Sequence, residues 1–290
     1  MRRISLVVVT ATLLISTMQV GIPAAHADGR ATTSYYLALG DSMAAGFQPN
    51  TGLTRGYVGR VWGHFRRQIP GLSLRNLGCP GETTHSLITG KHSPCTYGAG
   101  SQLDAAISFL GAHAGAVSFV TITVGVNDLV EHCLNGRTGR MERACAVDIR
   151  PGVKSRLTTI VDALATAAPG VPVVGMTYHD PFLGLWGLVP GGFKLARADH
   201  RAMTVLNAGL ASGYGDAGLK VADVAETFQT DDFTDTVIVP GRGRLPVNVA
   251  HACGWTWFCT AKYFFDPHPN WKGYKRVART FDRKLRGLLA

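Results

Sequence analysis

Short β-rich runs alternate with helical patterns along almost the whole chain, and this alternation constrains the fold more than any other feature. Five runs carry the β-branched and aromatic residues typical of strands: 35–39, 72–77, 118–124, 171–178 and 219–224. Five stretches have helical periodicity: 57–68, 102–112, 153–168, 195–213 and 271–288. We therefore predict an α/β fold of three layers, in which helices cover both faces of a parallel sheet.

Segments outside this pattern are expected to be insertions in a single domain. They fall at 90–100, 129–151, 180–193 and 229–263, and they contain or adjoin the cysteines. No stretch has the composition of a linker between domains.

Composition is that of a globular protein without a nucleic-acid partner. Hydrophobic residues make up 46% of the chain and charged residues 17%, which is enough apolar material to offset the entropy of the chain. The formal net charge is +10, but the basic residues are scattered singly or in pairs. A nucleic-acid footprint needs clustered Lys and Arg, so we expect no such partner.

The N-terminus has the three parts of a secretory signal peptide. A cationic start at 1–3 precedes an apolar stretch at 4–20, and residues 25–27 have the small-x-small pattern of a cleavage site. A membrane anchor is the alternative, but Thr, Ser and Gln interrupt the apolar stretch too often for a span. We predict export, cleavage after Ala27 and a mature domain of residues 28–290.

Six cysteines agree with an oxidising destination. They form three close pairs along the chain: Cys79 with Cys95, Cys133 with Cys145, and Cys253 with Cys259. We expect each pair to form a disulfide that closes a short loop. A zinc site is the rival interpretation, and the lack of any C-x-x-C spacing argues against it.

Polar motifs follow the predicted strands at the edge where a parallel sheet places its binding site. The first strand ends in Gly-Asp-Ser (40–42), the second leads into Asn-Leu-Gly-Cys-Pro-Gly-Glu-Thr (76–83), and the third into Val-Gly-Val-Asn-Asp (124–128). Phe-Asp-Pro-His-Pro-Asn (265–270) comes just before the last helix. Each motif alone is a common turn, but four of them in this order indicate one site.

In these motifs the chain resembles the SGNH, or GDSL, family of serine hydrolases, and most of all the secreted actinobacterial esterases and lipases with three disulfides. The resemblance extends over essentially the whole mature chain. It implies the SGNH hydrolase fold, with a flavodoxin-like parallel five-stranded sheet, and neither cofactor nor metal. It also implies four roles: Ser42 as nucleophile, His268 as general base, and Gly81 and Asn127 as oxyanion-hole donors.

Elementary chemistry supports these roles. A serine hydroxyl is a weak nucleophile at neutral pH, and a nearby histidine removes its proton during attack and later protonates the leaving alcohol. The tetrahedral intermediate carries a negative oxygen, for which the N–H of Ser42, the N–H of Gly81 and the amide of Asn127 provide three donors. Glycine at position 81 lets bare backbone approach that oxygen.

The sequence departs from the family pattern beside the histidine. The family has Asp three residues before it, whereas here Phe265 holds that position and Asp266 lies two residues before His268. Two arrangements stay open. Either Asp266 accepts a hydrogen bond from the imidazole, or a backbone carbonyl of the 263–266 segment orients the ring and the site is a dyad.

We expect a secreted, monomeric enzyme that hydrolyses lipid or simple acyl esters and makes transient contact with lipid surfaces. Removal of acetyl groups from polysaccharide is a second hypothesis, and a non-catalytic surface-binding protein is a third. The α/β-hydrolase pattern is excluded on two grounds. Position 44 is Ala where G-x-S-x-G requires Gly, and Ser42 follows the first strand of the sheet.

Four further segments have two interpretations each. His179 and Asp180 either contact the site or bond to the backbone of their own loop. The apolar segment 182–189 forms a lip for an acyl chain or covers a helix, and 254–258 forms a wall of the pocket or packs under a disulfide. The arginines of 241–244 belong to a solvated turn or attract anionic lipid headgroups.

Overall fold

A computed structural model describes residues 33–53, 55–263 and 265–289 of the chain. The predicted signal peptide and its cleavage site at Ala27 lie outside these residues. Within the described ranges, no helix is both long enough and apolar enough to span a membrane.

The central sheet has five parallel strands in the order β2-β1-β3-β6-β7. They are β1 (Ser34–Gly40), β2 (Leu72–Asn76), β3 (Val117–Thr123), β6 (Val173–Met176) and β7 (Lys220–Ala222). Each coincides with one of the predicted runs, so the expected α/β fold with a parallel five-stranded sheet is confirmed. After β2 the chain crosses to the other side of β1 to form β3. This creates a switch point between the carboxyl ends of β1 and β3, where open α/β sheets bind ligands.

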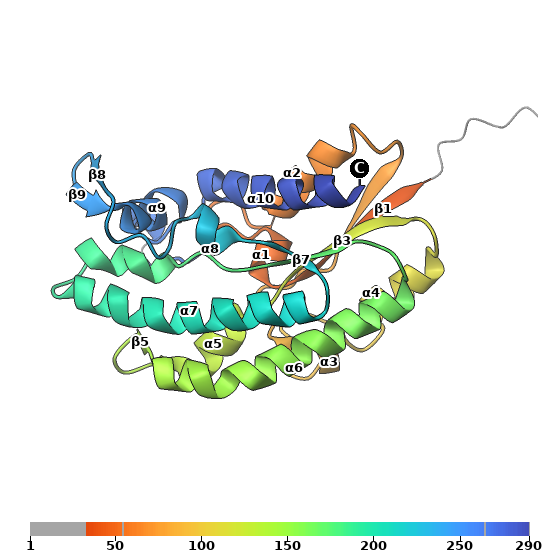
Figure 1. Cartoon of the computed structure of the whole chain (residues 1–290), viewed down its shortest axis with the longest axis horizontal. Helices are drawn as coiled ribbons and strands as arrows, with labels where there is room; N and C mark the ends of the chain where they lie inside the picture. The colour runs from red at the N-terminus through yellow and green to blue at the C-terminus, as the bar shows by residue number, and fades with distance from the viewer. Residues whose placement is uncertain (1–32, 54, 264, 290) are drawn as a thin grey trace, which may run out of the picture. The chain divides into compact units, whose positions relative to one another are not determined.

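Helices cover both faces of this sheet (Figure 1). One layer has two helices: α2 (Tyr57–Phe65) and α10 (Trp271–Leu289). The other layer has three: α4 (Gln102–Ala112), α6 (Arg143–Ala167) and α7 (Gly192–Asp216). The rings of Tyr57 and Phe281 stack 4.5 Å apart between α2 and α10, and both side chains are fully buried. The two layers thus cover both faces of the sheet. The edge formed by the carboxyl ends of its strands is where we expect the functional site.

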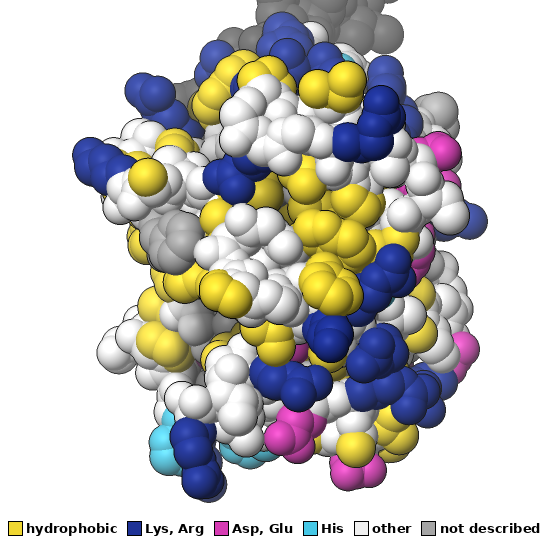
Figure 2. Space-filling view, turned by 90° about the vertical axis from the view of Figure 1, so that its left-hand side faces the viewer, with side chains coloured by type: hydrophobic (Ala, Val, Ile, Leu, Met, Phe, Trp, Pro, Cys, Tyr) yellow, Lys and Arg dark blue, Asp and Glu magenta, His cyan; other side chains and the backbone are white. Residues whose placement is uncertain are grey.

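Shorter elements lie between the strands and the long helices. The short helices are α1 (Ser42–Ala45), α3 (Thr84–Thr89), α5 (Val126–Cys133), η1 (Pro181–Gly187), α8 (Val224–Thr227), α9 (Val247–Trp255) and η2 (Ala261–Tyr263). Two hairpins join β4 (Leu134–Asn135) to β5 (Arg140–Met141) and β8 (Thr236–Val239) to β9 (Gly243–Pro246). The carboxyl ends of the sheet strands point toward the end of the molecule that carries β8 and β9, and this end faces the viewer in Figure 2.

Two of the predicted insertions contain more regular structure than the sequence pattern indicates. The helix predicted at 153–168 was wrong in its start, because α6 begins at Arg143 and continues through Pro151. A proline usually ends a helix because it lacks one N–H donor and crowds the preceding turn. Here the disulfide at Cys145 fixes the first turn of the helix. The 229–263 segment is also ordered into β8, β9 and α9, because its apolar side chains build a small second core around Leu183.

The three predicted disulfides are present, as Cys79–Cys95, Cys133–Cys145 and Cys253–Cys259. Among the described residues, no cysteine is left with a free thiol. Each bridge pins a segment that follows a strand or precedes the last helix. In a chain-entropy account, closing loops of this size stabilises the fold by about 2 to 4 kcal/mol per bridge.

Candidate active site

The site begins at the switch point, where β1 passes directly into α1. Gly40 ends the strand with φ 126°, and a Cβ there would lie 1.9 Å from the carbonyl oxygen of Thr123 on β3. Only glycine allows the two strands to end this close together. Asp41 is the N-cap of α1, and Ser42 is its first residue. Ser42 therefore lies at the carboxyl end of the central strand pair.

Asp41 is fully buried and fixes the turn that presents Ser42. Its carboxylate accepts hydrogen bonds from the backbone N–H of Met43 at 2.8 Å, from the hydroxyl of Thr123 at 3.2 Å and from the hydroxyl of Tyr178 at 2.5 Å. Burial raises the pKa of Asp41 to about 6, although the Tyr178 bond, the Met43 bond and the other contacts lower it. Tyr178 ends the fourth predicted strand, and nothing in the sequence pattern predicted its bond to Asp41.

The imidazole of His268 reaches this serine from the opposite end of the chain. Its Nε2 lies 2.8 Å from Oγ of Ser42, and its Nδ1 lies 2.9 Å from Oδ1 of Asp266. The same Asp266 oxygen accepts a bond of 2.9 Å from the backbone N–H of His268. With a proton on Nδ1, the ring donates to Asp266 and leaves Nε2 as acceptor for the serine hydroxyl. The geometry is that of a Ser-His-Asp chain, with the carboxylate in the place that a carbonyl would take in a dyad.

The two-residue spacing works because the backbone turns sharply before Asp266. Phe265 has φ 64°, a left-handed conformation that is uncommon for a residue with a side chain. The Asp266 N–H then donates to the carbonyl of Tyr263, and the carboxylate turns back toward His268. Periodicity and motif spacing carry no information about such a turn, which is why the sequence left two arrangements open.

A second histidine holds the loop that carries His268. His179 follows β6, and its Nε2 donates to the carbonyl of Pro267 at 2.9 Å. It is nine-tenths or more buried, and burial lowers the pKa of its ring to about 4, so the ring is neutral at pH 7. His179 also lines the cavity beside Ser42. Of its two interpretations, contact with the site is correct.

Asn127 lies in the segment after β3, and Gly81 lies in the segment after β2. Asn127 lies in the first turn of α5, and its Nδ2 donates to the carbonyl of Glu82 at 2.9 Å. That bond orients the amide and uses one of its two N–H groups. Gly81 directly precedes Glu82 and has φ 86°, and a Cβ there would lie 3.1 Å from a side-chain carbon of Pro94. The cavity lining includes Asn127 but not Gly81.

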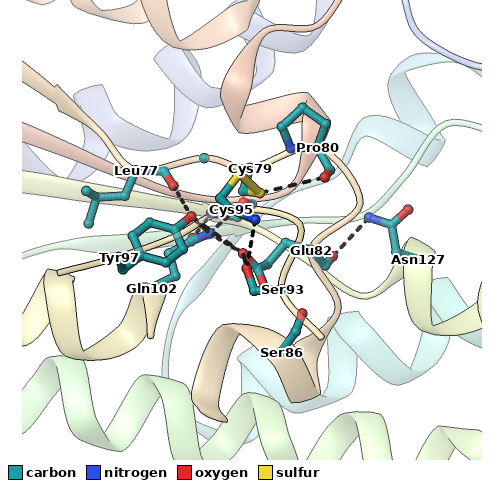
Figure 3. The surroundings of a disulfide bond; sticks show 12 residues. Leu77, Cys79, Pro80, Glu82, Ser86, Ser93, Cys95, Tyr97, Gln102 and Asn127 are labelled. Atoms are coloured by element: carbon teal, nitrogen blue, oxygen red, sulfur yellow. Dashed lines mark hydrogen bonds between the residues drawn. A yellow bond between two sulfur atoms is a disulfide. The ribbon is translucent and has the colours of Figure 1, made fainter. Parts of the chain in front are cut away.

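A buried polar pair, Glu82 and Gln102, connects the segments after β1 and β2 (Figure 3). Gln102 clamps the backbone of Gly40 on both sides, with Oε1 accepting from its N–H at 2.5 Å and Nε2 donating to its carbonyl at 3.0 Å. The same Nε2 lies 3.1 Å from Oε2 of Glu82, which also accepts from the hydroxyl of Ser93 at 3.0 Å. Ser93 lies in the loop closed by the Cys79–Cys95 disulfide. The residue before Asp41 and the residue after Gly81 are therefore linked through two side chains.

A second buried group fixes the start of α5. Asp128 accepts hydrogen bonds from the backbone N–H of Thr84 at 2.8 Å and from its hydroxyl at 2.6 Å. Arg156 of α6 completes the cluster, 3.1 Å from Asp128 and 2.6 Å from the Thr84 hydroxyl. The polar residue next to Asn127 thus joins α3, α5 and α6. Sequence reasoning missed Gln102 and Arg156, and the only signal was a polar side chain in the helical patterns that contain them.

The cavity beside Ser42 has a volume of about 140 Å³. Its lining is mostly apolar and comprises Ser42, Met43, Val126, Asn127, Val130, Tyr178, His179, Pro181, Phe182, Pro267 and His268. Phe182 of η1 meets Phe258 edge to face at 5.9 Å. The 182–189 segment therefore contributes Phe182 to the cavity wall. The 254–258 segment packs against Phe182 through Phe258.

Asp180 is engaged away from Ser42. Its carboxylate accepts from the N–H of Phe182 in its own loop and lies 3.0 Å from Nδ1 of His200 on α7. In the part of the chain that the structure describes, no group of three or more His, Cys, Asp or Glu side chains could hold a metal ion. The chemistry of the site is that of a hydroxyl, an imidazole, a carboxylate and amide donors.

Comparison with known proteins places the chain in a family. The model described as the GDSL-like Lipase/Acylhydrolase family matches residues 38–276. No curated relative matches the chain.

Solved structures share the fold at low sequence identity. The extracellular lipase from Streptomyces rimosus is 21% identical with a TM-score of 0.57, and the match covers 87% of this chain and 100% of that chain. The alpha/beta hydrolase enzyme LAE5, from the metagenome of Lake Arreo in Spain, is 18% identical with a TM-score of 0.53, over 90% and 98% of the chains. The lipase Lip_vut3 from a goat rumen metagenome is 15% identical with a TM-score of 0.53, over 87% and 97%.

Proposed function

The chain belongs to the GDSL-like lipase/acylhydrolase family, and from this premise we propose that it is a secreted serine esterase or lipase that cleaves carboxylic esters. The observation that carries the proposal is the hydrogen-bonded chain from Ser42 through His268 to Asp266, with Asn127 lining the same cavity. A nucleophile, a base with its orienting group and an oxyanion donor have no joint use in a protein that only binds.

In the first half of the reaction, Oγ of Ser42 attacks the ester carbonyl carbon while Nε2 of His268 takes the hydroxyl proton. The carbonyl oxygen becomes an oxyanion, and the Ser42 N–H, the Gly81 N–H and the Asn127 amide donate to it. Collapse of this intermediate breaks the bond to the alcohol oxygen. His268 gives its proton to that oxygen, the alcohol leaves, and the acyl group stays on Ser42.

In the second half, water replaces the alcohol. His268 takes a proton from the water as its oxygen attacks the acyl carbon, and the second tetrahedral intermediate uses the same donors. Its collapse releases the carboxylic acid and returns the proton to Ser42. Asp266 keeps the Nδ1 proton in place through both halves and stabilises the imidazolium that forms in each.

The lining of the cavity favours an apolar acyl group. The lining is mostly apolar and includes Val126, Val130 and Phe182, whereas an acetylated sugar needs polar partners for its hydroxyls. The structural neighbour from Streptomyces rimosus is described as an extracellular lipase. The signal-peptide pattern and the three disulfides support export of this chain as well.

The test is hydrolysis of p-nitrophenyl esters from acetate to palmitate by the oxidised protein, with Ser42→Ala as control. We expect turnover that requires Ser42, and the preferred chain length then separates an esterase from a lipase. No turnover at any length by a folded protein would contradict the proposal. A sharp preference for acetate, together with release of acetate from acetylated xylan, would favour the polysaccharide hypothesis instead.

A further inference from the structure

The exposed large hydrophobic side chains of the described residues all lie in segments at the edge formed by the carboxyl ends of the sheet strands. They are Leu53, Leu134, Phe193, Val237, Ile238, Phe265 and Trp271. Six of them lie in segments that follow the carboxyl end of a strand or lead into α10, and Trp271 is the first residue of α10. These segments lie at the edge of the sheet where Ser42 follows β1. The loops at the opposite edge, 66–71, 113–116, 168–172 and 217–219, contain none of them. Exposed apolar side chains gathered around a site indicate a surface that meets an apolar partner.

Each of three such side chains has a cationic neighbour. The Nζ of Lys194 lies 5.9 Å from the ring centre of Phe193, and that of Lys272 lies 5.9 Å from the ring centre of Trp271. Ile238, which is 73% exposed, is directly opposite Arg244 in the β8–β9 pairing.

Acidic residues are absent from the segments that carry these pairs. The segments 191–198, 236–246 and 271–276 contain Lys and Arg but no Asp or Glu. Figure 2 shows hydrophobic side chains in the middle of this face with Lys and Arg around them, and Asp and Glu mainly toward its lower part. Such a surface is complementary to anionic headgroups above an apolar layer.

Aromatic contacts connect the exposed apolar surface to the wall of the cavity beside Ser42. The exposed ring of Phe265 lies 5.3 Å from that of Phe258, which in turn meets Phe182 of the cavity wall at 5.9 Å. The hairpin is joined to the same segment, since the guanidinium of Arg242 donates to the carbonyl of Cys259 at 2.9 Å. The hairpin and the exposed Phe265 are therefore connected, through the 257–263 segment and Phe258, to the wall of the cavity beside Ser42.

We propose that the β8–β9 hairpin, the start of α7 and the segment before His268 form a docking surface for lipid bilayers or micelles with anionic headgroups. Ile238 and Phe193 enter the acyl layer, while Arg244 and Lys194 bind the headgroup phosphates. The purpose of this surface rests on the proposed function, because docking brings a lipid ester to the cavity. Docking itself does not require hydrolysis, so the two are tested separately.

The experiment measures sedimentation of the oxidised full chain with vesicles, in the Ser42→Ala background so that the lipid stays intact. Vesicles are phosphatidylcholine alone or mixed with phosphatidylglycerol. We expect binding to the anionic mixture that weakens with added salt, and much less binding to phosphatidylcholine alone.

Three variants separate the contributions. Ile238→Ser is expected to weaken binding roughly tenfold because it loses apolar burial, and Arg244→Gln about fivefold because it loses one phosphate contact. Lys220→Gln removes the same charge from an exposed position at the opposite edge of the sheet and should leave binding unchanged. Equal loss in Lys220→Gln and Arg244→Gln would overturn the proposal, since the attraction would then be a property of net charge alone.

Two further readouts complete the test. The activity assay uses chains that keep Ser42. Ile238→Ser should hydrolyse soluble p-nitrophenyl acetate as fast as the unaltered chain, but it should hydrolyse an ester in anionic vesicles more slowly. Light scattering of the chain with Ile238 and of Ile238→Ser tests whether this face binds a second copy instead. If the chain with Ile238 is a dimer and Ile238→Ser is a monomer that binds vesicles equally well, the face belongs to a dimer interface and lipid docking is overturned.

Discussion

The two sides of the site are built in different ways. The nucleophile side, residues 40–128, consists of strand ends and helix starts joined by fully buried polar side chains such as Asp41, Glu82 and Gln102. The histidine side, residues 257–263 and 265–270, has little regular structure besides η2, and its carboxylate and imidazole are each only partly buried. It is held by a few bonds, among them those from His179 to Pro267 and from the N–H of Trp257 to His268.

This difference fits the roles proposed for the two sides. Oxyanion donors must lie within a narrow range of distance from a charge that exists only in the transition state, which favours a rigid, buried scaffold. A general base moves a proton between the serine and the leaving group and needs only reach and the correct tautomer. We therefore expect single residues to dominate the histidine side and shared networks to dominate the nucleophile side.

The largest effect is expected on the histidine side. His268→Ala removes the base, and kcat for a p-nitrophenyl ester should fall about 10⁴-fold or more while KM changes little. Stopped-flow and steady-state assays measure this, with circular dichroism to show that the fold is intact. A variant that keeps a tenth of wild-type kcat would mean that another group accepts the serine proton.

The next effect concerns the orienting group. Asp266→Asn leaves the shape of the loop but offers an amide to Nδ1, which favours the wrong tautomer of His268. We expect kcat to fall several hundredfold or more. A loss of less than tenfold would show that a backbone carbonyl does the work, and the site would then be a dyad.

The pH dependence of stability differs between Asp41, on the nucleophile side, and His179, which bonds to the histidine side at Pro267. Folded Asp41 has a pKa of about 6 against an ordinary 3.8, because burial disfavours its charge, so its contribution to stability falls as pH rises from about 4 to 6. Folded His179 has a pKa of about 4 against 6.5, again because of burial, so its contribution is lost as pH falls from about 6.5 to 4. Each amounts to about 3 kcal/mol across its range.

The check is urea unfolding at several pH values. Relative to the unaltered chain, Asp41→Asn should gain stability as pH rises from 4 to 6, and His179→Gln should lose it over the same range. Slopes of the same sign in both variants would contradict the account.

The smallest effect on rate tests the network of the nucleophile side. Gln102→Ala releases Gly40 from Glu82 without touching the substrate, and we expect kcat to fall about 10- to 100-fold with KM nearly constant. Binding of a boronic acid, which forms a tetrahedral adduct with Ser42, should weaken in the same proportion.

Ser93→Ala is the matched control for this network. It removes another bond to Glu82 but leaves Gly40 clamped, and we expect a change of less than about threefold. If both variants lose activity equally, the bonds to Glu82 determine the rate, and the coupling of Glu82 to Gly40 through Gln102 does not.

The sequence allows prediction of one side of the site better than the other. Ser42 and Asn127 follow regular buried strands, whose apolar runs and order determine where their carboxyl ends meet. The contact between Asp266 and His268 depends on the left-handed conformation of Phe265, which no periodicity encodes. Gln102 and Tyr178 were missed for another reason, since a polar residue inside an apolar pattern reveals its partner only when the fold brings distant segments together.

The account rests on direct attack by Ser42, and covalent trapping tests it most directly. The oxidised protein is incubated with a p-nitrophenyl alkylphosphonate, and intact mass and peptide mapping locate the adduct. We predict a single phosphonyl group on Ser42, formed with release of p-nitrophenol, absent in Ser42→Ala and strongly slowed in His268→Ala. An unmodified Ser42 in a preparation that hydrolyses p-nitrophenyl esters, or an adduct on another residue, would contradict the account.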